Sequence, residues 1–385
     1  MLNRREILKQ GGLVAPFLLA GNVSLSAQQT AMIVHGRVPH NSETRLDRLI
    51  ESWITPNELF YVRSHAPVPT VDVDQFRLTI DGLVNKPLTI SLRELRTGFS
   101  QRSFVATLTC AGNRRIEHSA VKKVSGVQWQ AGAIGNAKWS GVTLSDLLKK
   151  AGLKEAAKHV WFEGVDQIKR SSGVIPFGAS IPIEKAMSDE GTMPGALVAT
   201  AMNGQPLPPD HGFPVRTVVP GFIGARSVKW LGKIIVSDQP SPNHYVATAY
   251  RLVKESTPEN WAAASILYDV PLNAITCLPE QGAMLKGGRV AVSGFALAPA
   301  SKGQTVRRVE ISADGGKHWS DAAFTTPAVP FCWRLWTAKV ALKQTTADLI
   351  VRATDSAGNV QPQSVPWNLK GYMFNAWHHT RVDVS

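Results

Sequence analysis

The stretch VRRVEISADGGKHW, residues 306–319, decides how the C-terminal part of the chain folds. Hydrophobic and polar residues alternate in its first half, and Asp-Gly-Gly then turns the chain. This alternation has the period of a strand with one buried face, and the glycines suit a hairpin turn. The same pattern returns in RVAVSGFAL (289–297), WRLWTAKV (333–340) and ADLIVRATDSAGN (347–359). We therefore predict an immunoglobulin-like β-sandwich over residues 266–385.

The chain upstream of the sandwich mixes short strands with short helices, and residues 28–60 are predicted to be irregular apart from a short helix in RLDRLIESW (45–53). FRLTIDGL (76–83) and FVATLTC (104–110) have strand patterns, whereas LSDLLKKAGL (144–153) and IPIEKAMSDEG (181–191) have helical ones. Regular strand–helix–strand units are absent, so the fold class is α+β rather than a doubly wound sheet. The chain has 385 residues, which is longer than a single hydrophobic core usually spans. We therefore place a second domain at residues 28–265.

Composition narrows the classes of function. The formal net charge is +13, which fits an anionic substrate, partner or surface. The basic residues do not gather into a run, so we expect no nucleic-acid partner. The sequence contains no glycine-rich dinucleotide fingerprint, no phosphate-binding loop of the Walker type, no His-Glu-x-x-His and no Cys-x-x-Cys-His. No motif therefore supports a nicotinamide-dependent enzyme, a nucleotide-binding protein, a zinc protease or a protein with covalently bound haem.

The first 27 residues have the layout of an export signal. Arg4 and Arg5 precede a weak apolar stretch, and small residues surround Ala27. Paired arginines are typical of the twin-arginine route, which carries folded proteins. A basic N-terminus of a cytosolic protein is the alternative. The apolar stretch is too short to span a bilayer, so we predict a periplasmic protein without stable membrane insertion.

TLTCAGNRR, residues 107–115, carries the cysteine with the most suggestive surroundings. Cys277 and Cys332 lie in apolar contexts and fit small buried residues. Cys110 instead precedes a Gly-Asn turn, Arg114 and Arg115, and such electropositive surroundings favour a thiolate. This thiolate could be a nucleophile or a metal ligand. A buried structural cysteine beside surface arginines is the equally weighted alternative.

Two further stretches place cations among turn residues. FYVRSHAPVP (60–69) contains Arg63 and His65. MNGQPLPPDHGFPVRTVVPGFIGARSVKWLGKI (202–234) contains five more, namely His211, Arg216, Arg226, Lys229 and Lys233. Each histidine alone fits an ordinary core or surface position. Taken together, the cations predict a site built around a fixed anion.

Seven stretches in order resemble the sulfite oxidase family of molybdenum enzymes from about residue 40 onward. They are TLTCAGNRR, FYVRSHAPVP, WQAGAIGNAKWSGVTLSDLL, FGASIPIEKAM, MNGQPLPPDHGFPVR, GFIGARSVKWLG and WNLKGYMFNAWHHTRV. The resemblance implies a molybdopterin-binding domain followed by an immunoglobulin-like dimerisation domain. It also implies that Cys110 binds molybdenum beside a pterin dithiolene.

The resemblance assigns roles to further residues by position. Arg63, Arg115, Trp129, Tyr250 and Lys370 correspond to the substrate pocket. Lys370 stands where animal and plant members carry arginine, and it keeps the charge but loses the bidentate fork. The residues that correspond to the pterin and phosphate contacts are Tyr61, Arg63, Ser64, His65, Asp166, His211, Arg216, Ser227 and Lys229.

The implied function is molybdenum-dependent oxidation of sulfite to sulfate. Since the chain has no haem motif, the expected electron acceptor is another protein, such as a c-type cytochrome, and the expected assembly is a homodimer or a complex with a haem subunit. Three alternatives remain: a sulfoxide reductase on the same scaffold, whose members lack the sandwich; the catalytic subunit of a thiosulfate-oxidising complex; and a secreted immunoglobulin-like binding protein without metal.

Overall fold

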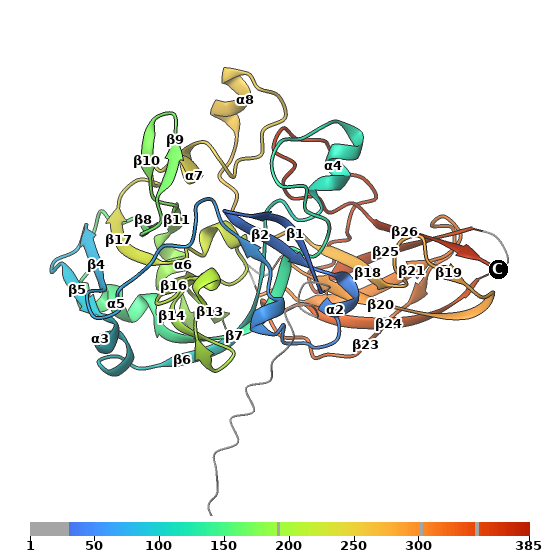
Figure 1. Ribbon diagram of the computed structural model, residues 1–385, viewed down its shortest axis with the longest axis horizontal. Coiled ribbons are helices and arrows are strands. Elements are labelled where there is room, and N and C mark those ends of the chain that lie inside the picture. The colour runs from blue at the N-terminus through green and yellow to red at the C-terminus, as the bar shows by residue number, and fades with distance from the viewer. Residues whose placement is uncertain (1–30, 191–192, 300–302, 343–345) are drawn as a thin grey trace, which may run out of the picture.

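The computed structural model describes residues 31–190, 193–299, 303–342 and 346–385. The predicted export signal lies outside these residues. Figure 1 shows the chain from blue to yellow in one mixed body, and the orange and red C-terminal strands in an elongated body beside it. Among the described residues, no helix combines the length and hydrophobicity needed to cross a bilayer.

Two five-stranded sheets form the mixed body. The first has the order β11-β8-β17-β4-β5, in which β17 and β4 are parallel and the other pairs antiparallel. Its strands are β4 (Arg77–Gly82), β5 (Leu88–Ser91), β8 (His159–Gly164), β11 (Gly178–Pro182) and β17 (Leu231–Ser237). The second has the order β15-β14-β7-β6, with β16 also paired to β14. Its strands are β6 (Arg102–Thr109), β7 (Ile134–Thr143), β14 (Leu197–Met202), β15 (Gln205–Pro206) and β16 (Arg216–Val218).

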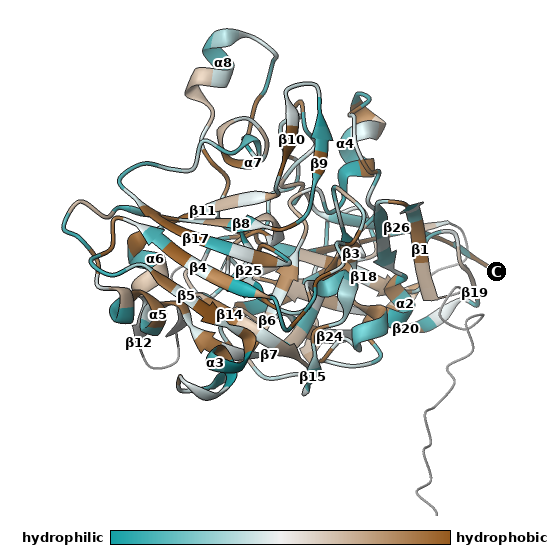
Figure 2. Ribbon diagram, turned by 60° about the vertical axis from the view of Figure 1, so that its left-hand side comes forward, coloured by the Kyte–Doolittle hydropathy of each residue, from teal (hydrophilic) through white to brown (hydrophobic). Residues whose placement is uncertain are grey.

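Short helices cover these sheets and close one hydrophobic core. Helix α5 buries Leu144, Leu147 and Leu148 against strands of both sheets, as its helical hydrophobic spacing requires. Figure 2 shows hydrophobic residues along β4 and β17 in the interior. The helices are α2 (Leu46–Leu49), α3 (Leu92–Thr97), α4 (Arg115–Val121), α5 (Leu144–Ala151), α6 (Ile183–Met187), α7 (His244–Ala247) and α8 (Pro258–Ala263), with 3-10 turns η1 (Asn57–Leu59), η2 (Pro209–His211) and η3 (Gly224–Arg226).

A small sheet near the N-terminus lies against the mixed body. It has the order β1-β2-β3, from β1 (Met32–Arg37), β2 (His40–Thr44) and β3 (Val62–Arg63). Two more small pairs are β9 (Ile168–Arg170) with β10 (Gly173–Ile175), and β12 (Asp189–Glu190) with β13 (Met193–Pro194). Sequence reasoning took residues 28–60 as irregular apart from a short helix. That prediction was wrong for β1 and β2 and right for α2.

The C-terminal body is a sandwich of two sheets with a shared core. One sheet has the order β18-β20-β24-β23 and the other β19-β26-β25-β21-β22. Val292, Trp336 and Ala338 from the first sheet pack with Val309 and Val351 from the second. The strands are β18 (Asn273–Leu278), β19 (Met284–Leu285), β20 (Gly288–Leu297), β21 (Val306–Ser312), β22 (Ser320–Asp321), β23 (Ala323–Phe324), β24 (Arg334–Leu342), β25 (Ala347–Asp355) and β26 (His378–Val384). This arrangement confirms the predicted α+β domain followed by a β-sandwich. The boundary at residue 265 stays a prediction.

A second hydrophobic cluster joins the two bodies. Tyr250 and Ile223 of the mixed body pack in it with Phe295, Trp333 and Tyr372 of the C-terminal part. Tyr250 belongs both to this cluster and to the lining of the cavity described below, all of whose lining residues lie in the mixed body.

Candidate functional site

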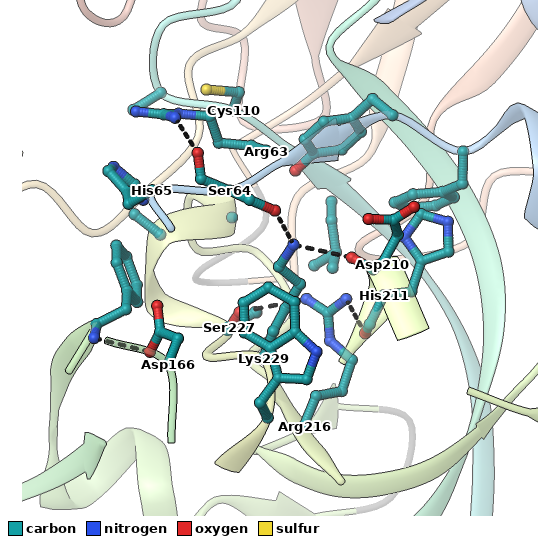
Figure 3. Close-up of a pocket in the computed structure, with 18 of the residues that line it drawn as sticks. Arg63, Ser64, His65, Cys110, Asp166, Asp210, His211, Arg216, Ser227 and Lys229 are labelled. Carbon is teal, nitrogen blue, oxygen red and sulfur yellow. Dashed lines mark hydrogen bonds between the residues drawn. The ribbon is translucent and has the colours of Figure 1, made fainter. Parts of the chain in front are cut away.

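A cavity lies between the small N-terminal sheet and the loops that follow β6, β8, β15 and β16, and its empty space together with the open solvent at its mouth is about 670 Å³. All ten residues predicted to hold a cofactor line it, and Tyr250 joins them. Figure 3 labels ten of the lining residues, with Cys110 and Arg63 at one end and Arg216, His211 and Lys229 toward the other. Besides the predicted cofactor residues and Tyr250, the cavity is lined by Phe60, Leu108, Ala111, Phe177, Asp210, Gly224, Ala225 and Trp230.

Cys110 begins the turn that follows β6, and backbone contacts fix its position. Its amide donates to the Ala133 carbonyl at 2.9 Å, and its carbonyl accepts from the Asn113 amide at 3.0 Å. The Gly112 amide lies 3.4 Å from Sγ and donates to it. The thiol is buried and unpaired with another cysteine. Among the described residues, no cluster of three histidine, cysteine or acidic side chains could hold a metal. A metal at this thiol must therefore bring most of its own ligands.

Arg63 lies at the same end of the cavity as Cys110 (Figure 3). Its Nη1 donates to the Ser64 carbonyl at 2.6 Å and to Asn41 Oδ1 at 3.0 Å. Both acceptors are neutral, and within the described chain Arg63 takes part in no ion pair. Its positive charge is therefore available to an anion in the cavity.

The far end of the cavity carries a buried cationic group. Lys229 Nζ donates to Ser64 Oγ and to the Asp210 carbonyl, both at 2.8 Å. Burial, followed by the charge of Arg216, lowers the pKa of Lys229 to about 7. Burial also lowers the pKa of Arg216 to about 10 and that of His211 to about 3. His211 is therefore neutral near pH 7, whereas the desolvated charges of Arg216 and protonated Lys229 are stabilised by a bound anion, and a phosphate suits them.

Asp166 supplies an acceptor on another wall of the same cavity. Its Oδ1 accepts from the Phe177 amide at 2.9 Å, whereas the buried Oδ2 has no hydrogen-bond partner among the described residues. Burial raises the pKa of this carboxyl. A ligand with N–H donors, as a pterin has, would satisfy the orphaned oxygen.

Tyr250 lies in the cavity wall in a left-handed backbone conformation, with φ of 53°. Its hydroxyl is 3.3 Å from His65 Nε2, and its ring stacks on Tyr372 at 5.3 Å between centroids. Burial raises the pKa of Tyr250 and lowers that of His65 well below its ordinary value. Both side chains are therefore neutral near pH 7, and the Tyr250 hydroxyl is a hydrogen-bond donor rather than a base.

Arg226 and Lys233 do not join the cationic group, which corrects the expectation drawn from their stretch. Arg226 is fully buried and donates from Nη1 to the Tyr245 carbonyl at 3.1 Å and from Nε to the Leu267 carbonyl at 2.9 Å. Lys233 pairs with Asp81 at 3.1 Å on the exposed side of β17. The spacing of cations in a Gly/Pro-rich segment did not reveal which side of the backbone each would take.

Arg115 lies outside the cavity lining, in a slot made by three glycines. A Cβ on Gly112 would lie 2.4 Å from its Nη2, one on Gly126 3.0 Å from its Nη1, and one on Gly371 2.8 Å from its Cγ. Its Nε donates to the Lys370 carbonyl at 3.0 Å and its Nη1 to the Val127 carbonyl at 2.8 Å. These contacts hold the guanidinium beside Gly112, two residues beyond Cys110.

The two other predicted substrate-pocket residues also lie outside the lining. Trp129 is fully buried, its ring meets His35 edge-on at 4.9 Å, and its Nε1 has no partner among the described residues. Lys370 Nζ lies 5.5 Å from the centre of the Trp261 ring on α8. The structure therefore gathers Arg63 and Tyr250 at the cavity and places Arg115, Trp129 and Lys370 around it.

Arg114 faces away from the thiol, against the expectation that both arginines act on Cys110. It is fully buried and forms an ion pair with Glu117 at 2.6 Å. Its Nη1 donates to Asn273 Oδ1 at 2.8 Å and to the Ala376 carbonyl at 2.7 Å. Arg114 therefore ties the cysteine turn to the sandwich.

The comparisons with known proteins agree with this geometry. Residues 65–245 match the family model of the oxidoreductase molybdopterin binding domain, and residues 264–385 match that of the Mo-co oxidoreductase dimerisation domain. The chain is 40% identical to chicken (Gallus gallus) sulfite oxidase over 359 residues, covering 90% of this chain and 76% of that protein. The chain belongs to the sulfite oxidase family of molybdenum enzymes.

Other members of the sulfite oxidase family extend the comparison. The chain is 39% identical to mitochondrial sulfite oxidase of Mus musculus over 92% of its own length, and it spans 66% of that protein. It is 37% identical to sulfite oxidase of Arabidopsis thaliana, covering 91% of this chain and 94% of that protein. The solved structure of the sulfane dehydrogenase SoxCD from Paracoccus pantotrophus matches with a TM-score of 0.81 and 26% identity, covering 97% of this chain and 93% of that one.

The chain is thus a molybdenum oxidoreductase whose cofactor is molybdenum with molybdopterin, and the cavity fits that group. One thiol suits a metal that arrives with a dithiolene, the orphaned Asp166 oxygen suits a pterin N–H, and the buried cations suit a phosphate. Sequence reasoning missed Asn41, Phe177 and Asp210 in or next to this site. Phe177, at the start of the quoted FGASIPIEKAM stretch, and Asp210, in the quoted MNGQPLPPDHGFPVR stretch, lay in segments singled out beforehand, whereas Asn41 did not.

Proposed function

We propose that this chain oxidises sulfite to sulfate and passes the electrons to an external acceptor, such as a c-type cytochrome. The supporting observation is that the Cys110 thiol and the unpaired Arg63 guanidinium share one end of a cavity whose other end is cationic. Sulfite plus water gives sulfate, two protons and two electrons. An anion that must approach an oxidised metal requires positive charge beside that metal.

The chain's own residues would hold the cofactor and guide the anion. When bound, the cofactor supplies the two-electron redox chemistry. Cys110 would hold the metal, Asp166 the pterin, and Lys229 with Arg216 the phosphate. Arg63 would bind and orient the substrate anion from the cavity wall, and Arg115 would add positive charge from its glycine slot. Tyr250 would donate a hydrogen bond from its neutral hydroxyl, while the buried walls exclude bulk water.

The relatives support this substrate class. Proteins named sulfite oxidase from mouse, chicken and Arabidopsis are 37–40% identical to the chain over about nine tenths of its length. The match to the dimerisation domain supports a pair of copies through the sandwich or a complex with another subunit. We further propose export by the twin-arginine route and a periplasmic location, which rest on Arg4, Arg5 and the short apolar stretch after them.

A second candidate is the catalytic subunit of a sulfane dehydrogenase complex. It is favoured by the SoxCD structure, which matches almost the whole chain. Such an enzyme would need a dedicated haem-containing partner to accept its electrons. Sulfoxide reduction on the same scaffold ranks below both because it leaves the β18–β26 sandwich without a counterpart.

A steady-state assay separates these functions. Purified, molybdenum-loaded protein is mixed with ferricyanide or cytochrome c, and reduction is followed with sulfite or thiosulfate as donor. Methionine sulfoxide reduction with a reduced dye is measured in parallel. Sulfite-dependent reduction that saturates in the micromolar to millimolar range supports the proposal. Turnover only with thiosulfate or only with methionine sulfoxide would replace it by the corresponding alternative.

A further inference from the structure

Strand β2 is polar along its whole length and yet mostly buried. Its sequence is His-Asn-Ser-Glu-Thr, and Asn41, Ser42, Glu43 and Thr44 are all shielded from solvent. Buried polar groups persist where they are hydrogen-bonded, so such a strand must be satisfied by its neighbours. The strand lies upstream of residues 65–245, which match the molybdopterin-binding model.

Two residues of β2 contact two different segments near the site. The Glu43 carboxylate accepts from the amides of Gln130 and Gly132 at 2.8 and 2.9 Å, next to the Cys110 turn. Asn41 points to β3, and Asn41 and Arg63 are register partners in the β2–β3 pair. A strand held on both sides in this way has little freedom to shift.

The amide oxygen of Asn41 is the contact that bears on the anion site. It accepts from Arg63 Nη1 at 3.0 Å and from the Ser64 backbone amide at 3.2 Å. Asn41 Nδ2 donates to the Pro39 carbonyl at 2.9 Å, which fixes the orientation of the side-chain amide. One neutral oxygen thus restrains both the Arg63 guanidinium and the backbone of the next residue.

The neutrality of the Asn41 oxygen matters because Arg63 forms no ion pair within the described chain. A carboxylate in the same place would form a charge-assisted bond with the guanidinium and offset its charge. An amide oxygen directs the guanidinium without neutralising it. Within the described chain, the remaining nitrogens Nε and Nη2 form no hydrogen bond, so they are free to meet a ligand.

We propose that Asn41 is a positioning residue that sets the affinity of the site for its anionic substrate by orienting Arg63 while leaving its charge free. The inference rests on the proposed function only in naming sulfite as that anion. Asn41 itself does not line the cavity and acts through Arg63.

The decisive variant is Asn41→Asp, which keeps the shape and both accepting contacts and adds one negative charge. We expect KM for sulfite to rise about 10-fold or more, as expected for an opposite charge within 4 Å, with kcat changed less than 3-fold. Asn85→Asp is the matched control, because Asn85 is exposed in the turn between β4 and β5 and the substitution adds the same charge. It should behave as the wild type.

A binding measurement makes the test independent of turnover. Sulfate, the product of the proposed reaction, should raise the melting temperature of the molybdenum-loaded wild type and of Asn85→Asp, and should do so less for Asn41→Asp. Arg63→Gln gives the reference for loss of the site. Equal sulfate-dependent shifts in all four proteins, including no shift in any, would overturn the proposal.

The two proposals fail in different ways. If the wild type does not oxidise sulfite, the proposed function fails while the sulfate titration still decides the role of Asn41. If the wild type oxidises sulfite and Asn41→Asp has the same KM, the role of Asn41 fails alone.

Should Asn41→Asp not fold, Asn41→Ser replaces it, because the shorter neutral side chain releases Arg63. Its KM should then rise about 3-fold or more, and an unchanged KM would contradict the proposal.

Discussion

We expect Lys229 to make retention of the cofactor depend on pH. Its ammonium is desolvated, and the neighbouring Arg216 adds repulsion, so the pKa of Lys229 falls to about 7 without a bound anion. A phosphate at this end of the cavity would bind the protonated form and raise that pKa. The sign follows directly: affinity is fully present below pH 7 and is lost as the pH rises above it.

The size of the effect follows from this pKa. With a pKa of about 7, the protonated fraction of Lys229 falls from about 76% at pH 6.5 to about 3% at pH 8.5. The affinity for a phosphate group should therefore fall about 25-fold over this range. Lys229→Met removes the ammonium and its charge-assisted bond, worth about 1.5–3 kcal/mol, so affinity at pH 6.5 should fall about 10-fold or more. The variant should also lose the pH dependence.

The assay follows molybdenum and pterin rather than turnover. Loaded protein is dialysed at pH 6.5, 7.5 and 8.5, and the rate at which molybdenum and the fluorescent oxidised pterin are lost is measured. Lys233→Met is the control, because Lys233 lies close by in the sequence, on β17, and its partly exposed side chain pairs with Asp81 on the surface. Loss that does not depend on pH in the wild type, or that depends on pH equally in Lys229→Met, would refute the reasoning.

Three further predictions concern the thiol end of the cavity. Cys110→Ser should abolish molybdenum binding and sulfite oxidation with a melting temperature within a few degrees of the wild type; stoichiometric molybdenum with unchanged turnover would contradict the ligand assignment. Gly112→Ala places a methyl group 2.4 Å from Arg115 Nη2 and should raise KM for sulfite about 5-fold by displacing the guanidinium, as Arg115→Met should also do; an unchanged KM in both would remove Arg115 from the site. Lys370→Arg should leave KM for sulfite unchanged or lower it, measured at low and high salt, and a collapse of activity would mean a different arrangement of the pocket.

Local periodicity predicted the sandwich and several elements of the mixed body. Strand β25 follows the alternation of ADLIVRATD, and α5 follows the helical spacing of LSDLLKKA. In both cases the buried face is set by hydrophobic residues within one segment, so the pattern can be seen without the partner. Strand β2 shows the limit of such reasoning. Its burial depends on hydrogen bonds to Arg63, Gln130 and Gly132, which are distant in the sequence, and no local pattern reveals them.

The candidate site was also predicted only in part from the sequence. Residues carried by the family's motifs, such as Cys110, His211 and Lys229, gather at one cavity. Reasoning from charge alone did not place Arg114 and Arg226, because a cation among turn residues can face a ligand or carry backbone carbonyls of another segment. The Ala376 carbonyl orients the Arg114 side chain, and the Tyr245 carbonyl orients that of Arg226. Both carbonyls belong to other segments of the chain, so the local sequence around each arginine does not reveal them.

The buried bonds of Arg114 have a consequence for attempts to shorten the protein. The turn that carries the thiol is anchored through this arginine to Asn273 and Ala376, and the Met373 amide donates to the Ala111 carbonyl at 2.8 Å. A fragment that stopped before the sandwich would leave the buried Arg114 guanidinium without these acceptors, in the turn that carries Cys110. The C-terminal part of the chain therefore also holds the Cys110 turn in place. A chimaera that joined the mixed body to another domain would need that domain to offer the same hydrogen-bond acceptors to Arg114.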